Sequence, residues 1–375
     1  MRQTLRIFAV AGALALPVLV CQPAQAEASA ATQPAESRSV EVCFVLDTTG
    51  SMSGLIEGAK KKIWSIANSI VAADPKAKVR FALVPYRDRD DEYVTKVFDL
   101  TDDLDKVFAD LQAFQAGGGG DGPESVNQAL DEAVNKIGWT ADEATVKFVF
   151  LVGDFPPHMD YQDDVKFPRT CEAAVRKNLI INTVQCGENA ETAEVWREIA
   201  RRGEGTYVAL EQSGGMIAMD TPMDEEIARL SAQIGELAVP YGSVEQRREV
   251  ASKTVAAASA PAAVQADRAY FNAASGKAIQ GRGDLVSDLR ENSVALDAVP
   301  EAELPENMRA MSAEQRVAYL KDQGEKRDAL NARVAELSKQ RQAYIAEQNR
   351  KLPASADAFD AKVSETVKTQ MERKR

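Results

Sequence analysis

Histidine and basic residues are scarce in this chain, and each shortage excludes a class of function. The 375 residues include one histidine, His158, so a zinc site built from several histidines is excluded. A catalytic dyad or triad would have to use this histidine, yet no serine or cysteine nucleophile motif stands beside it. The 45 Lys and Arg residues against 57 Asp and Glu give a net charge of -12. This balance argues against nucleic acid or an anionic membrane as the main partner.

The apolar run nearest the N-terminus is too short to cross a bilayer. It covers residues 7–20, about 14 residues where a spanning helix needs about 20. Two arginines precede it, and an Ala-Gln-Ala sequence at 24–26 supplies the small residues of a cleavage site. We therefore expect a secretory signal peptide over 1–26 and a flexible N-terminus over 27–38. This predicts a periplasmic or secreted protein with no membrane span after cleavage; an uncleaved anchor is the alternative.

Cysteine is also rare, and three of the four cysteines remain after the expected cleavage. Cys43 lies in a strand-like run, where it is expected to be a buried apolar residue. Cys171 falls in the first turn of an expected helix and Cys186 at the end of the next expected strand. These two ends share one side of a strand-helix-strand crossover, so Cys171 and Cys186 form a candidate disulfide. Whether their sulfur atoms approach within bonding distance is left open by the sequence.

Short apolar runs alternate with amphipathic stretches between residues 39 and 242. Runs typical of buried strands occur at 40–46, 79–86, 146–152, 179–184 and 206–210. Residues 93–100 alternate like an edge strand joined to its neighbour by a hairpin. The pattern predicts an α/β fold of the doubly wound, Rossmann-like class, with a mostly parallel six-stranded sheet and one antiparallel edge strand. We assign it to one domain, 39–242.

The C-terminal third has a different character. Small residues and little periodicity predict a linker or irregular region over 243–304. Helix signals return in 305–375, where Ser312 begins a sequence close to a capping box. Apolar residues at heptad-like spacing between 330 and 344 favour a short coiled coil or helix hairpin. Self-association through 312–349 is therefore a hypothesis, beside the alternative of a solvated helix face without a partner.

Oxygen-bearing side chains gather where the predicted strands end. Asp47, Thr49 and Ser51 follow the first strand at every second position, in the sequence DTTGSMS. One carboxylate and two hydroxyls in a tight turn suit a hard divalent cation such as Mg²⁺. Asp154 ends a later apolar strand, and the loop GGGGDGPE contributes Asp121 and a glutamate. Because the carboxyl ends of parallel strands face one crevice, these residues should meet there.

Three further residues are candidates for the rim of this site. Asp88 lies in the charged hairpin turn RDRDDE, Glu124 ends the glycine-rich loop, and His158 follows the two prolines after Asp154. A charged turn is usually just solvated, so the alternative for these residues is a surface role without a ligand. His158 is expected at the rim rather than as a catalytic base.

The turn DTTGSMS, the glycine-rich loop and the Gly-Asp pair at 153–154 resemble the von Willebrand factor A (vWA) domain with its metal-ion-dependent adhesion site. The resemblance covers about residues 39–240. It implies metal-site roles for Asp47, Thr49, Ser51 and Asp154, with the hydroxyls binding Mg²⁺ directly and the aspartates holding its waters; Ca²⁺ and Mn²⁺ are alternatives. The C-terminal region resembles that of bacterial exported vWA proteins without an assigned activity.

Asp121 departs from the adhesion-type pattern, which has a threonine in the second loop. Three carboxylates would then surround a doubly charged ion and leave little positive charge to attract an acidic partner residue. This predicts tighter metal retention and weaker capture of a partner carboxylate, provided that Asp121 points towards the ion.

The leading hypothesis is an exported, non-enzymatic module that binds a divalent cation and, through it, a protein partner of unknown identity. One alternative is a scaffold that oligomerises through its C-terminal helices and keeps a purely structural metal site. A remote alternative is a haloacid-dehalogenase-like phosphohydrolase, which needs a second aspartate two residues after the first. Thr49 occupies that position.

Overall fold

The computed structural model describes residues 39–74, 77–120, 122–212, 219–351 and 359–373. They belong to one compact unit. The expected signal peptide and flexible N-terminus lie outside the described residues, as does Asp121. Among the described helices, none has both the length and the apolar character needed to cross a lipid bilayer.

A six-stranded sheet forms the centre of the fold, in the spatial order β3-β2-β1-β4-β5-β6. All neighbouring strands pair in parallel except β3, which pairs antiparallel with β2 at one edge. The predicted α/β, mostly parallel fold is thus confirmed. The strands are β1 (Ser39–Asp47), β2 (Lys78–Tyr86), β3 (Phe98–Thr101), β4 (Val146–Gly153), β5 (Leu179–Cys186) and β6 (Glu204–Leu210).

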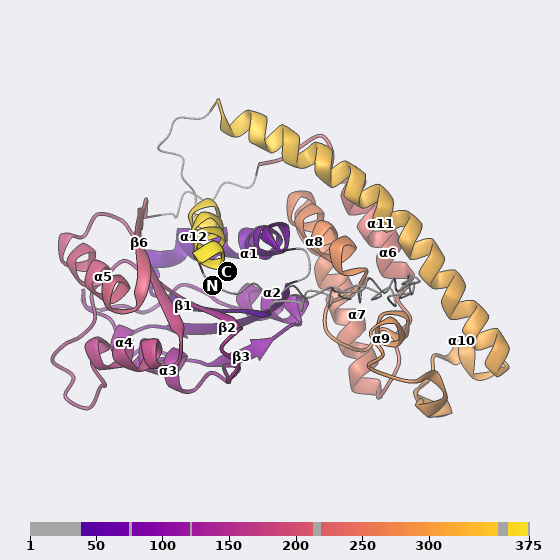
Figure 1. Cartoon of the computed structure of the whole chain (residues 1–375), viewed down its shortest axis with the longest axis horizontal. Coiled ribbons are helices and arrows are strands. Elements are labelled where there is room, and N and C mark those ends of the chain that lie inside the picture. Colours follow the sequence, from indigo (N-terminus) through magenta and orange to yellow (C-terminus); the bar gives the residue numbers. More distant parts are fainter. Residues whose placement is uncertain (1–38, 75–76, 121, 213–218, 352–358, 374–375) are drawn as a thin grey trace, which may run out of the picture. The chain divides into compact units, whose positions relative to one another are not determined.

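Helices cover both faces of the sheet, and the strand side chains alternate between two cores. In β1, Val42 and Phe44 point into one core, whereas Cys43 and Val45 point into the other. Helices α1, α2 and α12 contribute to the first core and α3, α4 and α5 to the second (Figure 1). Their bounds are α1 (Ser53–Ala73), α2 (Leu104–Gln112), α3 (Val126–Asn135), α4 (Phe167–Arg176), α5 (Ala190–Arg202) and α12 (Phe359–Arg373).

Cys171 and Cys186 lie on opposite faces of the sheet, so the candidate disulfide is wrong. Cys186 ends β5 and points into the core shared with α1, whereas Cys171 of α4 is buried in the core of the other face. Both thiols are free, as is that of Cys43. The sequence placed the end of the strand correctly. It did not show which face the last side chain of that strand occupies, and a shift by one residue exchanges the faces.

The prediction of a linker or irregular region over 243–304 is also wrong. This segment contains α7 (Val244–Ser259), α8 (Ala262–Ser275) and α9 (Leu285–Arg290). Its many alanines show no apolar periodicity, yet alanine has the highest helix propensity and allows close packing. Ala266 and Ala269 of α8 are buried against α6 (Asp224–Glu236). The small residues that suggested a linker therefore form the contact surface of a helix.

The predicted helical C-terminal region is confirmed, and its long helix α11 (Ala313–Asn349) packs within its own chain. Val334 and Leu337 belong to the seam that suggested a coiled coil, and both are buried against α6 and α8. The short helix α10 (Glu306–Arg309) precedes α11. Because the seam is already covered inside the chain, it no longer provides a surface for self-association.

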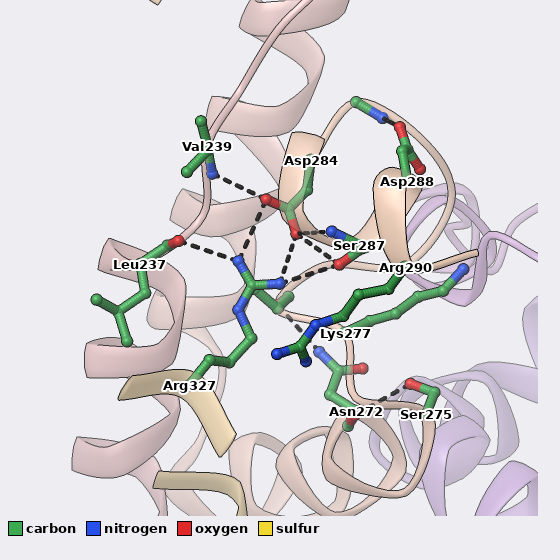
Figure 2. Close-up of polar contacts among 12 residues, drawn as sticks. Leu237, Val239, Asn272, Ser275, Lys277, Asp284, Ser287, Asp288, Arg290 and Arg327 are labelled. Atoms are coloured by element: carbon green, nitrogen blue, oxygen red, sulfur yellow. Dashed lines mark hydrogen bonds and ion pairs between the residues drawn. The ribbon is translucent and has the colours of Figure 1, made fainter. Parts of the chain in front are cut away.

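A buried arginine anchors the middle of α11. The guanidinium of Arg327 donates hydrogen bonds to the Asp284 carboxylate at 2.7 and 3.2 Å and to the Leu237 carbonyl oxygen at 3.0 Å (Figure 2). Ser287 accepts a further bond from it at 3.0 Å. Asp284 also accepts from the backbone N–H of Val239. These contacts tie α11, α9 and the end of α6 together.

The C-terminal helices also pack on the α/β part of the chain. Phe271 of α8 makes an edge-to-face contact with Trp64 of α1, with ring centroids 5.7 Å apart. Arg268 of α8 forms a buried bidentate pair with Asp105 of α2, at 2.7 and 2.8 Å. Val367 of α12 is buried in the same core as α1. The sheet, its helices and the C-terminal region therefore share contacts along α1 and α2.

Candidate functional site

The turn after β1 brings its three predicted ligands together. The Asp47 carboxylate accepts hydrogen bonds from the Thr49 N–H at 2.9 Å and from the Thr49 hydroxyl at 2.7 Å. The hydroxyl oxygens of Thr49 and Ser51 lie 3.2 Å apart. Asp47 and Thr49 are buried, whereas Ser51 is exposed. The chain then enters α1 through one turn of 3-10 helix, so the turn is held between a buried strand and a long helix.

Asp154 directly follows β4, the neighbour of β1, and lies close to Asp47. Burial first, and then the negative charge of Asp154, raise the pKa of Asp47 to about 7. Gly153 makes this approach possible, because a Cβ at that position would overlap the Tyr86 hydroxyl and lie 3.2 Å from the Asp47 carboxylate. The residue before Asp154 is therefore a glycine because any side chain at this position would clash with its neighbours.

The glycine-rich loop passes over the turn that contains Thr49. The N–H of Gly50 donates to the carbonyl oxygen of Gly118 at 3.3 Å. Gly118 has a φ of +75°, and a Cβ there would overlap the Asp91 side chain. Asp91 in turn accepts from the Gly119 N–H at 3.0 and 3.2 Å. Asp121 follows in the same loop but lies outside the described residues.

Glu124 is buried beneath this loop rather than at a rim, with 2% of its surface exposed. Burial is the main cause that raises the pKa of its carboxyl group to about 9, followed by the charge of Asp47. This pKa is raised further by the negative charges of Asp88, Asp91 and Asp154. Several carboxylates therefore share one poorly hydrated region.

Asp88 and His158 are buried as well, and they connect two loops. The Asp88 carboxylate accepts hydrogen bonds from the hydroxyls of Ser125 at 2.8 Å and Tyr161 at 2.9 Å. His158 Nε2 lies 3.3 Å from the same carboxylate, and its Nδ1 lies 2.8 Å from Asp160 Oδ1. The His158 ring stacks on Tyr161 with centroids 4.1 Å apart. Asp88 and His158, which were expected at the rim, thus connect the two loops from buried positions.

Residues 41–220 match the family model of the von Willebrand factor A domain. The structure is similar to that of the SpRpn10 VWA domain, at 13% identity and a TM-score of 0.36, over 47% of this chain and 89% of that chain. It is similar to proximal thread matrix protein 1 from the mussel byssus at 14% identity and a TM-score of 0.36, over 47% and 42% of the two chains. No curated protein matches the sequence at a significant level.

The side chains gathered at the ends of β1 and β4 fit a divalent cation. Oδ2 of Asp47 and Oδ1 of Asp154 are buried and have no hydrogen-bond partner among the described residues. Oε2 of Glu124 is likewise buried and has no hydrogen-bond partner among the described residues. Buried carboxylate oxygens without partners are costly unless a cation or water satisfies them. Within the described residues, no three His, Cys, Asp or Glu side chains are arranged to hold a metal, and the set at this site consists of two carboxylates and two hydroxyls.

Gln212 is a site residue that the sequence did not suggest. It follows β6, and its amide N–H donates to Asp154 Oδ2 at 2.7 Å and to the Ser51 carbonyl oxygen at 3.3 Å. Gln212 carries no charge and belongs to no sequence motif that would have marked it as a site residue. The topological rule could have found it, because the carboxyl end of β6 faces the same crevice as those of β1 and β4.

Proposed function

We propose that this protein is an exported, non-enzymatic vWA module that binds a divalent cation and, through it, a protein partner. The observation that carries the metal site is the pair of buried, unpartnered oxygens of Asp47 and Asp154 beside the hydroxyls of Thr49 and Ser51. Mg²⁺ is the first candidate because it prefers oxygen ligands and retains several waters; Ca²⁺ and Mn²⁺ are alternatives.

Each side chain has a distinct task in this proposal. The hydroxyls of Thr49 and Ser51 would bind the ion, and the carboxylates of Asp47 and Asp154 would offset its charge and hold its waters. The two hydrogen bonds from Thr49 to Asp47 keep one carboxylate oxygen fixed and leave the other one available. A bound ion supplies positive charge and open coordination positions for oxygen atoms of a partner.

A non-enzymatic role is supported by the surroundings of the only histidine. His158 is buried between Asp88 and Asp160 and stacks on Tyr161, which suits a structural task. Thr49 stands where the phosphohydrolase chemistry needs an aspartate. Export is proposed from the basic, apolar and small-residue pattern of residues 1–26.

Thermal unfolding of residues 27–375 tests metal binding. Saturating MgCl2, CaCl2 or MnCl2 should raise the unfolding midpoint, because a ligand at about 100 times its Kd adds about 2.7 kcal/mol of stability. Asp47→Asn should abolish this rise while raising the midpoint of the metal-free protein, since it removes a buried negative charge beside Asp154. Asp297→Asn changes an exposed aspartate elsewhere and should leave both midpoints unchanged.

Two outcomes would overturn the proposal. A midpoint that does not respond to any of the three ions would remove the metal site. Turnover of p-nitrophenyl phosphate that is lost in Asp47→Asn would make the protein an enzyme instead.

A further inference from the structure

We infer that the face around the metal site accepts a positively charged protein segment with an apolar side chain, rather than an acidic one. The inference rests on the proposed function and names the chemistry of the partner. It follows from three properties of the loops at this face: their mutual contacts, their charge and their exposed apolar residues.

The loops form one connected surface. Arg89 of the β2–β3 loop donates to Asp163 at 2.9 Å and to Asp164 at 3.0 Å in the β4–α4 loop. Glu124 pairs with Pro157 through a β-bridge, and Ser125 donates to Asp88. A segment that reaches the metal turn must therefore also meet the charged loops beside it.

These loops are strongly acidic. Residues 47–53, 87–92, 122–124 and 154–166 contain three basic residues, Arg87, Arg89 and Lys166. Their ten acidic residues are Asp47, Asp88, Asp90, Asp91, Glu92, Glu124, Asp154, Asp160, Asp163 and Asp164. Glu124 is largely protonated near neutral pH because burial raises its pKa to about 9, so at most six excess negative charges remain, and a divalent ion offsets two of them. The face thus stays negative when the ion is bound and repels a partner carboxylate.

The basic residues of the face are engaged within it. Arg87 donates to the backbone oxygens of Thr48 and Gln115, at 3.2 and 2.7 Å. Arg89 lies over the Tyr161 ring, 3.9 Å from its centroid, in addition to its aspartate contacts. Lys166 donates to the Tyr161 carbonyl oxygen. These contacts engage the cations within the face, which keeps an excess of acidic residues.

Buried carboxyl oxygens without hydrogen-bond partners in the described part of the chain lie behind the same face as the exposed acidic residues. Oε2 of Glu124 and Oδ1 of Asp154 have no hydrogen-bond partner among the described residues, and both side chains are more than nine-tenths buried. In contrast, Asp160 and Asp163 at the rim expose 74% and 75% of their side chains. The exposure of these outer charges favours a cationic ligand.

Apolar side chains on the same loop define the second feature of the partner. Met159 and Val165 are exposed to 49% and 41%, on either side of Tyr161. Methionine, tyrosine and arginine are enriched in protein interfaces, and the Tyr161 ring is already fixed between His158 and Arg89. A fixed platform loses little conformational entropy on binding. The surface therefore suits lysine or arginine residues interleaved with large apolar ones.

Three fluorescein-labelled decapeptides with alternating residues test this inference: Lys-Gly, Glu-Gly and Lys-Leu. Their binding to residues 27–375 is measured by fluorescence anisotropy with Mg²⁺ present, at low and at physiological salt. We expect the order Lys-Leu, then Lys-Gly, with no binding of Glu-Gly, and weaker binding at higher salt. Tighter binding of the Glu-Gly peptide would overturn the inference.

Paired variants show whether binding is local or merely reflects the net charge of the chain. Asp90→Asn/Asp163→Asn removes two charges from the rim, and Asp297→Asn/Glu301→Gln removes two exposed charges elsewhere. The rim variant should weaken Lys-Gly binding about fivefold, consistent with about 0.5 kcal/mol for each exposed contact, and the second variant should not. Equal effects of the two variants would contradict the inference.

The apolar feature has its own variant. Met159→Ser should reduce the affinity for Lys-Leu to that for Lys-Gly and leave Lys-Gly unchanged; a difference that persists would remove Met159 from the surface. The Mg²⁺-dependent thermal shift of the unchanged protein, recorded in the same buffer, reports the proposed metal site separately. A shift without peptide binding overturns only this inference, whereas absence of the shift overturns the proposed function.

Discussion

Gln212 and Asp154 show how one amide can moderate a crowded group of carboxylates. Asp154 has one oxygen bonded to Gln212 and one oxygen without a partner among the described residues. The amide donates a hydrogen bond without adding charge, so it stabilises the ionised aspartate and leaves the other oxygen available for a cation.

Gln212→Ala should therefore destabilise the metal-free protein and enlarge its response to metal. Loss of the hydrogen bond leaves a second oxygen of Asp154 without a donor, at a cost of about 1 kcal/mol. Urea unfolding with EDTA and with saturating Mg²⁺ measures the two states. Gln162→Ala is the control, because this exposed residue donates to a backbone oxygen on the same face. Equal losses in EDTA and in Mg²⁺ would show that Gln212 acts independently of the metal site.

The cysteines illustrate the opposite case, in which burial suppresses chemistry. Burial is the largest influence on Cys171 and raises the pKa of its thiol to about 12. Burial also raises the pKa values of Cys43 and Cys186. The thiolate is the reactive form, so these thiols are inert in the folded protein.

Cys171→Ala should flatten the alkaline loss of stability. Between about pH 9 and 12 the unfolded chain has lost the Cys171 proton while the folded chain keeps it, so stability falls with rising pH by about 1.4 kcal/mol per unit. The contribution is fully present below about pH 8.5. Urea unfolding at pH 8, 9.5 and 10.5 should show that the difference between the variant and the unchanged protein narrows as the pH rises. A constant difference would mean that the thiol is accessible.

At the scale of elements, the sequence predicted the strands and helices whose hydrophobic pattern lies within one short segment of the chain. The alternation of buried strands and amphipathic helices identified the sheet, and the positions of Asp47, Thr49, Ser51 and Asp154 followed from the strand ends. The helices of 243–304 were missed because alanines replace the large apolar residues that reveal a helix face. The burial of His158 was missed because it depends on a contact with Asp88 in a distant loop.

A second set of contacts without local pattern joins α2 to α8. Asp105 and Arg268 are both buried, and the Asp105 carboxylate also accepts from the Gln280 N–H at 2.9 Å. Removing one partner of such a pair leaves a buried charge unbalanced.

Asp105→Ala should consequently destabilise the protein by about 3–5 kcal/mol, because Arg268 would remain buried and unpaired. The double variant Asp105→Leu/Arg268→Met replaces the pair with apolar residues and should recover most of this loss. Asp328→Asn, at an exposed pair with Arg290, should cost less than about 1 kcal/mol. Urea unfolding followed by tryptophan fluorescence measures all three. A double variant as unstable as Asp105→Ala would show that the pair contributes more than mutual neutralisation.

At the scale of the molecule, residues far apart in the chain complete one core. Val363, Val367 and Met371 of α12 are buried in the same core as α1 and the sheet. Gln370 of α12 exchanges side-chain hydrogen bonds with Asn182 of β5, at 2.7 and 3.1 Å. Val264 and Phe271 of α8 join this core as well. Helix α12 is thus an integral part of the α/β fold.

Removal of residues 352–375 should therefore destabilise the whole protein. Each of the three buried side chains of α12 contributes about 1.5–3 kcal/mol, so the loss should reach about 5 kcal/mol. The truncated protein should also bind the dye ANS at the face of the core that α12 covers. Lys368→Ala alters the exposed side of α12 and should have no such effect. Because α1 begins directly after the turn of the proposed metal site and packs against α12, the truncation should also reduce the increase in unfolding midpoint that Mg²⁺ is expected to cause. A truncated chain that keeps full stability would show that α12 is not part of the core.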